Sequence, residues 1–383
     1  MKIVTCIAPV NIAVMKYWGK RDEDLILPIN DSLSATLNTN FMCAKTTILA
    51  SPDLKENKFW LNGKEESFEG KRLQNCLREV QRRAKDMNPD VLGWKIAICS
   101  ENNFPTAAGL ASSAAGYACL VSALAKLYNI EGEISDIARL GSGSACRSIY
   151  GGWVRWHKGE LSCGEDSVAR QVVPSSHWPE MRVLILVVND KKKKDSSTSG
   201  MQRSVDTSDL LLYRSDKIVP KRMEEMITSI KNKDFHNFAK LTMQDSNQFH
   251  ATCLDTYPPC VYMNDVSHSI SGLVHKYNEL FDENRVAYTF DAGPNACLYI
   301  LEKDVEEFLS VVNYVFPPPE VDQVEYLTGM PLENRKIKND LINSLNLTRN
   351  EPGLLKYIIH TNVGEGPTST DDHLLSLNGI PLK

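Results

Sequence analysis

Strand-like and helical hydrophobic patterns are mixed in both halves of this chain. Apolar residues alternate in Lys2–Ala8 and Trp94–Cys99, and Met181–Val188 is a short apolar run typical of a buried strand. In Arg72–Met87 they recur every three or four positions, which predicts an amphipathic helix. The same reasoning predicts helices at Met223–Ile230, Val266–Tyr277 and Asp304–Val315, and strands at Val286–Phe290, Cys297–Leu301 and Tyr357–Thr361. Because these elements do not alternate strictly, the pattern favours an α+β fold over a doubly wound parallel sheet.

The length of the chain predicts two lobes around a cleft. A chain of 383 residues is too long for one ordinary hydrophobic core. The lysine run Lys191–Lys194 follows the apolar strand that ends at Val188. We therefore expect an N-terminal lobe of residues 1–188 and a C-terminal lobe of residues 189–383.

Composition excludes several classes of protein. A formal net charge of -5 argues against a general nucleic-acid binder, because no basic field would attract a polyanion. No apolar run approaches the roughly 20 residues that span a bilayer, so we expect no membrane association. The ten cysteines show neither a CxxC pair nor zinc-ligand spacing, which indicates reduced thiols in an intracellular protein. The expected location is the cytoplasm. A peroxisome-like organelle stays open as the alternative, although Pro381-Leu-Lys383 is not an SKL-type ending.

A segment of small residues predicts an anion-binding loop before a helix. Pro105–Ala111 leads into a helix that runs to about Tyr128. A helix N-terminus offers unpaired N–H groups, and Ser112 or Ser113 could cap the helix or reach a phosphate-bound magnesium ion. No lysine follows Gly109 as it would in a Walker loop. The alternative is a serine-capped helix that packs tightly through its alanines.

The exit of the first strand concentrates cations and aromatic rings. Asn11–Arg21 contains Lys16, Tyr17, Trp18 and Lys20 in what we expect to be a loop. Cations beside aromatic faces suit an anion that is held partly desolvated. The alternative is a surface loop with packed aromatic rings and solvated lysines.

A Gly-Ser segment predicts a second anion-binding turn. Gly141–Arg147 reads GSGSACR, and Arg147 offers a planar fork that can hold a carboxylate through two parallel hydrogen bonds. A flexible linker is the alternative, but Ala145, Cys146 and Ile149 make the segment too apolar for one.

The segment Thr289–Cys297 carries a single carboxylate between two apolar strands. Asp291 lies at the end of a strand, beside Gly293 and Pro294. A carboxylate in this position can orient or deprotonate a hydroxyl group. The common alternative is an aspartate that caps a turn.

These segments, in this order, carry a family resemblance. Pro105–Ala115 resembles the phosphate loop of the GHMP small-molecule kinase superfamily. Four stretches look like those of the mevalonate diphosphate decarboxylase family: APVNIAVMKYWGKRD from Ala8, SENNFPTAAGLASSAAG from Ser100, GSGSACRS from Gly141 and YTFDAGPNA from Tyr288. Further matching stretches are LPINDSLS from Leu27, DSNQFHATCLDTYPP from Asp245 and MNDVS from Met263. The resemblance covers nearly the whole chain and is weakest from Pro317 to Arg349.

The resemblance implies both a fold and a reaction. The fold is an N-terminal lobe like ribosomal protein S5 domain 2, a C-terminal ferredoxin-like lobe and a deep cleft between them. The reaction converts ATP and (R)-mevalonate 5-diphosphate into isopentenyl diphosphate, ADP, phosphate and CO2, through phosphorylation of the tertiary 3-hydroxyl. Family members are commonly homodimers and need Mg2+, so we expect both here.

The same resemblance implies roles for individual residues. Asp291 orients the hydroxyl, as an orienting group or a full general base; Lys16 neutralises phosphate charge; and Arg147 holds the substrate carboxylate. The implied substrate-binding residues are Tyr17, Trp18, Gly19, Lys20, Arg72, Ser142, Gly143, Ser144, Ala145, Cys146, Arg147 and Thr198. The implied ATP-binding residues are Ala107, Ala108, Gly109, Leu110, Ala111, Ser112 and Ser113, and Ser113 also reaches the magnesium. The alternative for Arg72 is a solvated arginine at the end of a helix.

The lysine run near the expected lobe boundary has two interpretations. Lys191–Lys194 is either a solvated loop or a source of attraction for ATP. On the second interpretation, neutralising the four lysines raises the apparent KM for ATP. Steady-state kinetics with varied ATP test this, and an unchanged KM dismisses the hypothesis.

Two other functions compete with the decarboxylase. A mevalonate or phosphomevalonate kinase would stop at phosphorylation, but such kinases carry a glycine-rich third motif where this chain has Asp291-Ala-Gly-Pro-Asn. A catalytically silent metabolite sensor would require the loss of Asp291, Lys16 or Arg147, and all three are present.

Overall fold

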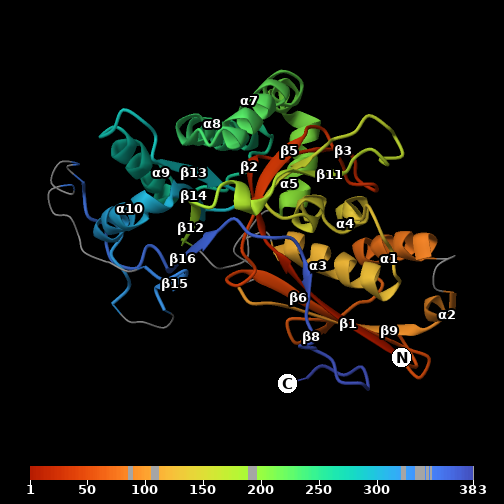
Figure 1. The fold of residues 1–383 in the computed structure, drawn as a ribbon. Helices are drawn as coiled ribbons and strands as arrows, with labels where there is room; N and C mark the ends of the chain where they lie inside the picture. Colours follow the sequence, from red (N-terminus) through yellow and green to blue (C-terminus); the bar gives the residue numbers. More distant parts are fainter. Residues whose placement is uncertain are drawn as a thin grey trace.

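The chain folds into two lobes that both mix helices and strands, which confirms the predicted α+β class (Figure 1). The structure, a computed structural model, describes residues 1–84, 89–104, 112–188, 196–320, 325–332, 341, 345 and 347–382, with the backbone alone at 89 and 90. Among the helices it describes, none is long and apolar enough to cross a membrane.

Two sheets form the framework of the N-terminal lobe. The strands of the larger one, in order across the sheet, are β17 (Thr368–Ser369), β1 (Lys2–Pro9), β6 (Cys43–Ser51), β9 (Lys95–Asn102), β7 (Lys58–Leu61) and β8 (Lys64–Glu66). The strands of the smaller one are β11 (Ala169–Val173), β10 (Trp153–Trp156), β5 (Ser32–Thr36) and β2 (Asn11–Met15). A short ribbon pairs β3 (Lys20–Asp22) with β4 (Leu27–Pro28).

Helices of the N-terminal lobe connect these sheets to the predicted anion-binding segments. They are α1 (Lys71–Ala84), α2 (Pro89–Leu92), α3 (Ser112–Leu127), α4 (Ser135–Gly141), the 3-10 helix η1 (Gly143–Ile149) and η2 (Ser175–His177). Helix α3 is rich in small apolar residues and is buried against β1 and β6, because alanines allow close approach of helix and sheet. Its N-terminus lies beside the start of η1, because Ser113 Oγ is 3.2 Å from Ser142 Oγ.

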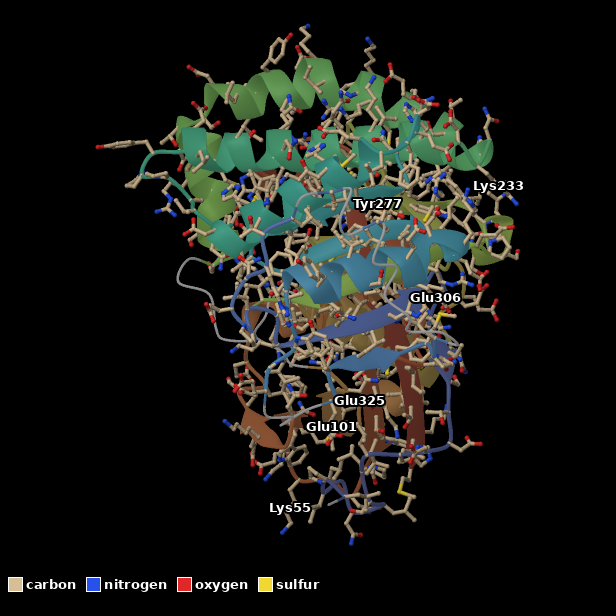
Figure 2. The ribbon with its side chains drawn as sticks, turned by 90° about the vertical axis from the view of Figure 1, so that its left-hand side faces the viewer. Lys55, Glu101, Lys233, Tyr277, Glu306 and Glu325 are labelled. Carbon is tan, nitrogen blue, oxygen red and sulfur yellow. The ribbon has the colours of Figure 1, made fainter. Side chains whose placement is uncertain are left out.

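The C-terminal lobe is built on one mixed sheet and a layer of helices. The sheet has the order β13 (Val286–Phe290), β14 (Ala296–Leu301), β12 (Met181–Val187), β16 (Tyr357–Asn362) and β15 (Leu327–Gly329). Its helices are α5 (Ser197–Thr207), α6 (Asp209–Tyr213), the π-helix η3 (Arg214–Ile218), α7 (Val219–Lys231), α8 (Phe235–Asp255), α9 (Asp265–Asn278) and α10 (Glu302–Val315). Helices α8, α9 and α10 pack on this sheet, and Figure 2 labels Tyr277 of α9 and Glu306 of α10. The Tyr277 ring lies 4.9 Å from that of Phe308, which ties the two helices together.

The sheets divide the chain differently from the predicted boundary at residue 188. Strand β12, which that boundary assigns to the N-terminal lobe, hydrogen-bonds to β14 and β16 in the C-terminal sheet. Conversely, β17 near the end of the chain returns to pair with β1 in the N-terminal lobe. The periodicity of a strand reveals that it is buried but not which sheet contains its partners.

Two local predictions need correction, and one helix was missed. Asn11–Met15 was expected to be part of a loop, but it is the edge strand β2, and all its residues are buried. The segment after Ser142 was expected to be a turn, and it forms the helix η1. Helix α8 was not predicted at all. Its apolar stripe is interrupted by buried polar residues such as Asp245 and Ser246, which contact both lobes.

Candidate active site

An ion pair between the two lobes is the centre of the candidate site. The Lys16 ammonium donates to Asp291 Oδ1 at 2.5 Å, although the two residues are 275 positions apart in the chain. The Lys16 side chain is 3% exposed, whereas that of Asp291 is 32% exposed. An ammonium group has three N–H donors, so Lys16 can contact Asp291 and an anionic ligand together.

Strand ends bring these two side chains together. Lys16 directly follows β2, and Asp291 directly follows β13. Between the strands, the Tyr299 hydroxyl donates to the Ile12 carbonyl at 2.9 Å and so connects the sheets of the two lobes. Strand ends are where the backbone ladder stops, which leaves side chains free to converge on a ligand.

Arg147 is buried and held in a fixed orientation by neutral groups. Its Nε donates to Ser34 Oγ at 3.0 Å and Asn11 Oδ1 at 3.3 Å, and its Nη1 donates to Ser32 Oγ at 2.5 Å. The guanidinium is 3% exposed, and no carboxylate of the described residues lies within ion-pair distance of it. A buried cation without a carboxylate partner is costly unless a ligand supplies the opposite charge.

The electrostatic surroundings of Arg147 connect it to the ion pair. Burial lowers the pKa of the guanidinium, and the negative charge of Asp291 acts in the opposite direction. Arginine nevertheless stays protonated in proteins. Burial also raises the pKa of the neighbouring Cys146 thiol to about 12, so this cysteine is an uncharged packing residue.

A tyrosine hydroxyl without a hydrogen-bond partner lies beside this arginine. The Tyr17 ring packs edge-on against Trp156 at 4.7 Å, and its buried hydroxyl has no hydrogen-bond partner among the described residues. A β-carbon at Gly143 would come within 2.9 Å of ring atoms of both aromatic residues, so glycine is required there. The hydroxyl is therefore available to a ligand.

The predicted nucleotide and substrate segments meet at two serines. Ser113 Oγ, in the first turn of α3, lies 3.2 Å from Ser142 Oγ, directly before η1. Ala107–Ala111 and Lys191–Lys194 lie outside the described residues. Of the predicted ATP-binding set, the structure thus describes Ser112 and Ser113.

The other predicted substrate residues differ in how open their side chains are. Arg72 Nη2 donates to Thr198 Oγ1 at 2.9 Å, so these two lie together at the exposed ends of α1 and α5. The Trp18 indole is 2% exposed, donates to Ser204 Oγ at 2.8 Å and packs edge-on against Phe249. The Lys20 ammonium lies 2.8 Å from Glu23 Oε2.

Two family models and curated relatives match most of the chain. Residues 8–169 match the diphosphomevalonate decarboxylase-like N-terminal domain, and residues 183–370 match the mevalonate 5-diphosphate decarboxylase C-terminal domain. The chain is 54% identical to the diphosphomevalonate decarboxylase of Danio rerio, over 100% of this chain and 97% of that protein. The chain belongs to the diphosphomevalonate decarboxylase family. It is thus one of the ATP-dependent decarboxylases of the mevalonate pathway.

Solved structures of the family have the same fold. A crystal structure of mevalonate 5-diphosphate decarboxylase superposes with a TM-score of 0.88 at 45% identity, covering 98% of this chain and 99% of that one. The structure of MDDEF in complex with MVAPP, AMPPCP and magnesium superposes with a TM-score of 0.74 at 29% identity, covering 96% and 99%. The two-lobe architecture is therefore that of the family.

Several supporting residues of this family member were missed by sequence reasoning. Asn11, Ser32 and Ser34 orient Arg147, and Asp245 and Arg214 contact the backbone of Lys16. Four of these five lie in stretches that resembled the family, but their chemistry depends on contacts between distant segments. Polar residues at buried positions of a strand, as in Ser32–Thr36, were the available signal.

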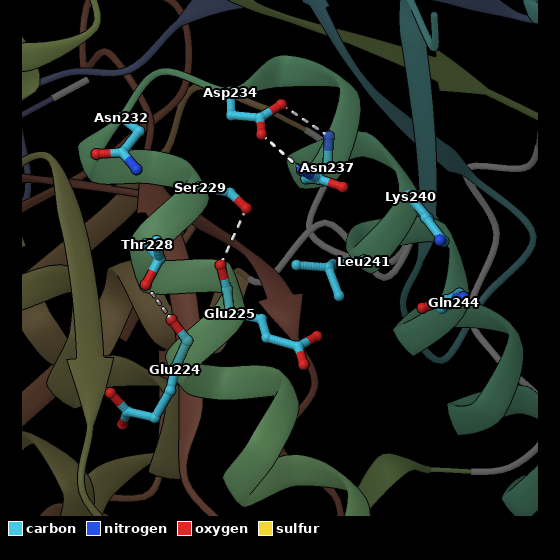
Figure 3. A pocket seen from close by; sticks show the side chains of 10 residues that line it. All are labelled: Glu224, Glu225, Thr228, Ser229, Asn232, Asp234, Asn237, Lys240, Leu241 and Gln244. Carbon is cyan, nitrogen blue, oxygen red and sulfur yellow. Dashed lines mark hydrogen bonds between the residues drawn. The ribbon is translucent and has the colours of Figure 1, made fainter.

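A cavity between α7 and α8 is not part of this site. Its volume is about 520 Å3, and Figure 3 shows the side chains that line it. Glu224, Glu225 and Asp234 give it acidic walls, with Lys240 as its one basic lining residue. These carboxylates would repel a diphosphate, so the family's anionic substrate does not fit there.

The lowered pKa of His250, in α8, predicts that the stability of the folded protein depends on pH. Burial and the nearby Lys16 lower its pKa to about 4, and its Nε2 lies 3.3 Å from the Phe290 carbonyl. Between pH 4 and the ordinary value of 6.5 the unfolded chain binds this proton and the folded protein does not, so stability falls as pH falls. The contribution lost is up to about 3 kcal/mol.

Urea unfolding at a series of pH values measures this loss. In His250→Gln the slope of unfolding free energy against pH should be smaller across this window. The pKa values of His157 and His360 are also lowered, chiefly by burial, so part of the slope should remain. Equal slopes in the two proteins would contradict the assignment.

Proposed function

We propose that this chain uses ATP to phosphorylate the tertiary 3-hydroxyl of (R)-mevalonate 5-diphosphate and then expels phosphate and CO2. The products are isopentenyl diphosphate and ADP. The observation that carries the proposal is the ion pair of Lys16 with Asp291, whose charge also acts on the pKa of the buried Arg147 guanidinium. Together they provide an acceptor for a hydroxyl proton, a cation for phosphate and a fork for a carboxylate.

Binding of the substrate uses both of its anionic ends. Arg147 takes the carboxylate, because its buried guanidinium has no carboxylate partner among the described residues and lies near enough to Asp291 for that charge to act on its pKa. Its hydroxyl and amide contacts keep the fork in one orientation. The Tyr17 hydroxyl donates to a substrate oxygen, and Arg72 with Thr198 binds the diphosphate at the exposed edge.

Phosphoryl transfer is assisted by the ion pair. Asp291 accepts a hydrogen bond from the tertiary hydroxyl and aligns its oxygen with the terminal phosphate of ATP. Lys16 offers its remaining N–H donors to the transferred phosphoryl group, whose negative charge it balances. Because phosphoryl transfer is largely dissociative, the alignment contributes more than early proton removal.

Decarboxylation follows when the new phosphate group leaves the tertiary carbon. Positive charge develops on the tertiary carbon as the carbon–oxygen bond breaks, and the Asp291 carboxylate stabilises that charge. The bond to the carboxylate carbon then breaks, CO2 departs, and the bonding electrons form the alkene. Arg147 keeps that bond aligned with the developing empty orbital.

The residues at the start of α3 fit a magnesium ion. Mg2+ binds through few protein oxygens together with substrate phosphates, and Ser113 places its hydroxyl in the first helical turn near Ser142. Bound there with ATP, the ion would neutralise phosphate charge. Ser113 and the N-terminus of α3 would hold the phosphates themselves.

We also propose a homodimer in the cytosol. Exposed apolar side chains gather on α6 and at the end of α8, namely Leu210, Leu212, Tyr213, Leu254 and Tyr257. Asp255 accepts hydrogen bonds from Ser208 and Leu210, which keeps these two elements together. Sedimentation equilibrium tests the dimer.

The proposed location in the cytosol rests on the cysteines. All ten are free thiols, which fits a reducing compartment, and fluorescence microscopy of the tagged chain tests the location.

One assay tests the proposed reaction. Purified protein is incubated with mevalonate 5-diphosphate and Mg-ATP, and ADP and CO2 are measured in the same sample. We expect one CO2 for each ADP. ADP without CO2 would instead indicate a kinase that stops after phosphorylation, and the absence of both would reject the proposal.

A further inference from the structure

The backbone of Lys16 is held by a buried ion pair that makes no contact with the Lys16 ammonium. The Lys16 N–H donates to Asp245 Oδ2 at 2.7 Å, and the Lys16 carbonyl accepts from Arg214 Nη2 at 3.2 Å. Asp245 and Arg214 also bind each other, at 2.7 Å and 2.9 Å, and both side chains are 0% exposed. Both peptide groups next to the Lys16 side chain are thus held by this pair, and Arg222 Nη1 donates to the same Asp245 carboxylate at 3.2 Å.

These two hydrogen bonds to the Lys16 backbone replace ones that the sheet does not supply beyond the end of β2. Lys16 lies just beyond β2, an edge strand of its sheet, so its N–H and carbonyl lack ladder partners. Asn30 Nδ2 adds a second donor to the same carbonyl at 3.1 Å. With these side chains in place, the Lys16 backbone has one conformation.

Helix α8, which contains Asp245, also binds the backbone of Phe290, the residue before Asp291. Ser246, next to Asp245 in α8, accepts a hydrogen bond from the Phe290 N–H at 3.0 Å. Helix α8 packs against both β2 and β13. It therefore sets the position of Lys16 relative to Asp291, even though neither residue belongs to it.

The choice of charged residues here points to positioning rather than stability. A buried ion pair contributes little net stability, because desolvation cancels most of the attraction. Arg214 begins the π-helical turn η3, an uncommon conformation that often occurs at functional sites. Its flat fork makes two parallel hydrogen bonds to the Asp245 carboxylate and also reaches the Lys16 carbonyl, a geometry that the point charge of an ammonium group does not reproduce.

We propose that Asp245 and Arg214 are positioning residues that hold the Lys16 ammonium against Asp291 during phosphoryl transfer. This inference rests on the proposed role of Lys16. The pair contacts the backbone of Lys16, and its other side-chain hydrogen bonds among the described residues are to Gln248, to Arg222 and between its own two members. Its loss should therefore lower turnover and leave substrate binding nearly unchanged.

The test compares Arg214→Lys in two backgrounds, because an effect that acts through Lys16 must vanish without its side chain. In the native background we expect Arg214→Lys to lower kcat about tenfold, with each KM changed less than about threefold. In the Lys16→Met background the same change should lower the residual kcat less than about twofold. Asp304→Asn, which removes a buried carboxylate 3.5 Å from Arg285, is the matched control and should leave kcat unchanged.

The outcomes separate this proposal from the proposed function. If Lys16→Met alone keeps the native kcat, the role of Lys16 in the reaction is wrong. If Lys16→Met lowers kcat but Arg214→Lys costs the same factor in both backgrounds, only the positioning role is wrong. Should Arg214→Lys fail to fold, the double change Asp245→Leu with Arg214→Met is compared in the same two backgrounds; it removes both charges of the pair and leaves Arg222, which is 15% exposed, without this carboxylate.

Discussion

Asp291→Asn should lower kcat about a thousandfold, within the range expected for a lost catalytic acid–base group. The amide keeps the size of the side chain and one oxygen for Lys16, but it cannot take a proton or balance the charge of a developing carbocation. Substrate binding should persist, because Arg147, Tyr17 and Arg72 are untouched. Steady-state kinetics measure the loss, and calorimetric titration with mevalonate 5-diphosphate measures the binding.

A matched variant separates chemistry from folding in this experiment. Asp304→Asn also removes a carboxylate beside an arginine in the C-terminal lobe, at a side chain that is 7% exposed. It should alter thermal stability at least as much as Asp291→Asn and leave kcat near the native value. If Asp291→Asn retains kcat within tenfold of the native enzyme, Asp291 has no part in the chemistry.

Arg147→Lys should lower kcat about a hundredfold, which is typical when a reacting group is misaligned by about an ångström. An ammonium group cannot form two parallel hydrogen bonds to a carboxylate while it also replaces the contacts to Ser32 and Ser34. The KM for mevalonate 5-diphosphate should rise as well, since the carboxylate loses its fork. Parallel measurement of ADP and CO2 shows which step suffers most.

Arg139→Lys provides the control for packing. Arg139 is likewise 3% exposed, and its guanidinium is held by the carbonyl oxygens of Leu25 and Gly164. If lost packing alone explains the effect at Arg147, the two lysine variants should lose similar activity. Full activity of Arg147→Lys would remove the assignment of the carboxylate to this residue.

Local pattern was sufficient for much of the secondary structure and for the choice of chemistry. The periodicity of apolar residues correctly predicted several elements, namely strands β1, β9, β13 and β14 and helices α1, α9 and α10. Short contiguous stretches also carried the family resemblance, because the residues of each anion-binding segment are neighbours in the chain. Such features depend on side chains a few positions apart, which a sequence displays directly.

Long-range partners could not be read in this way. The periodicity of Met181–Val187 indicated a buried strand, yet its sheet partners are β14 and β16, more than a hundred residues away. Helix α8 was hidden because buried polar residues interrupt its apolar stripe. Those residues were the ones that hydrogen-bond across the lobes.

The chemistry of this protein was legible in its residues, but the geometry of the site depended on the folded chain. The residue types Lys16, Arg147 and Asp291 already indicated a cation, a carboxylate fork and a proton acceptor. That Lys16 meets Asp291, and that Asp245 and Arg214 hold its backbone, follows from packing between the lobes. Hydrogen bonds between segments 198 to 275 residues apart arise from the burial of whole sheets and helices, and no local pattern encodes them.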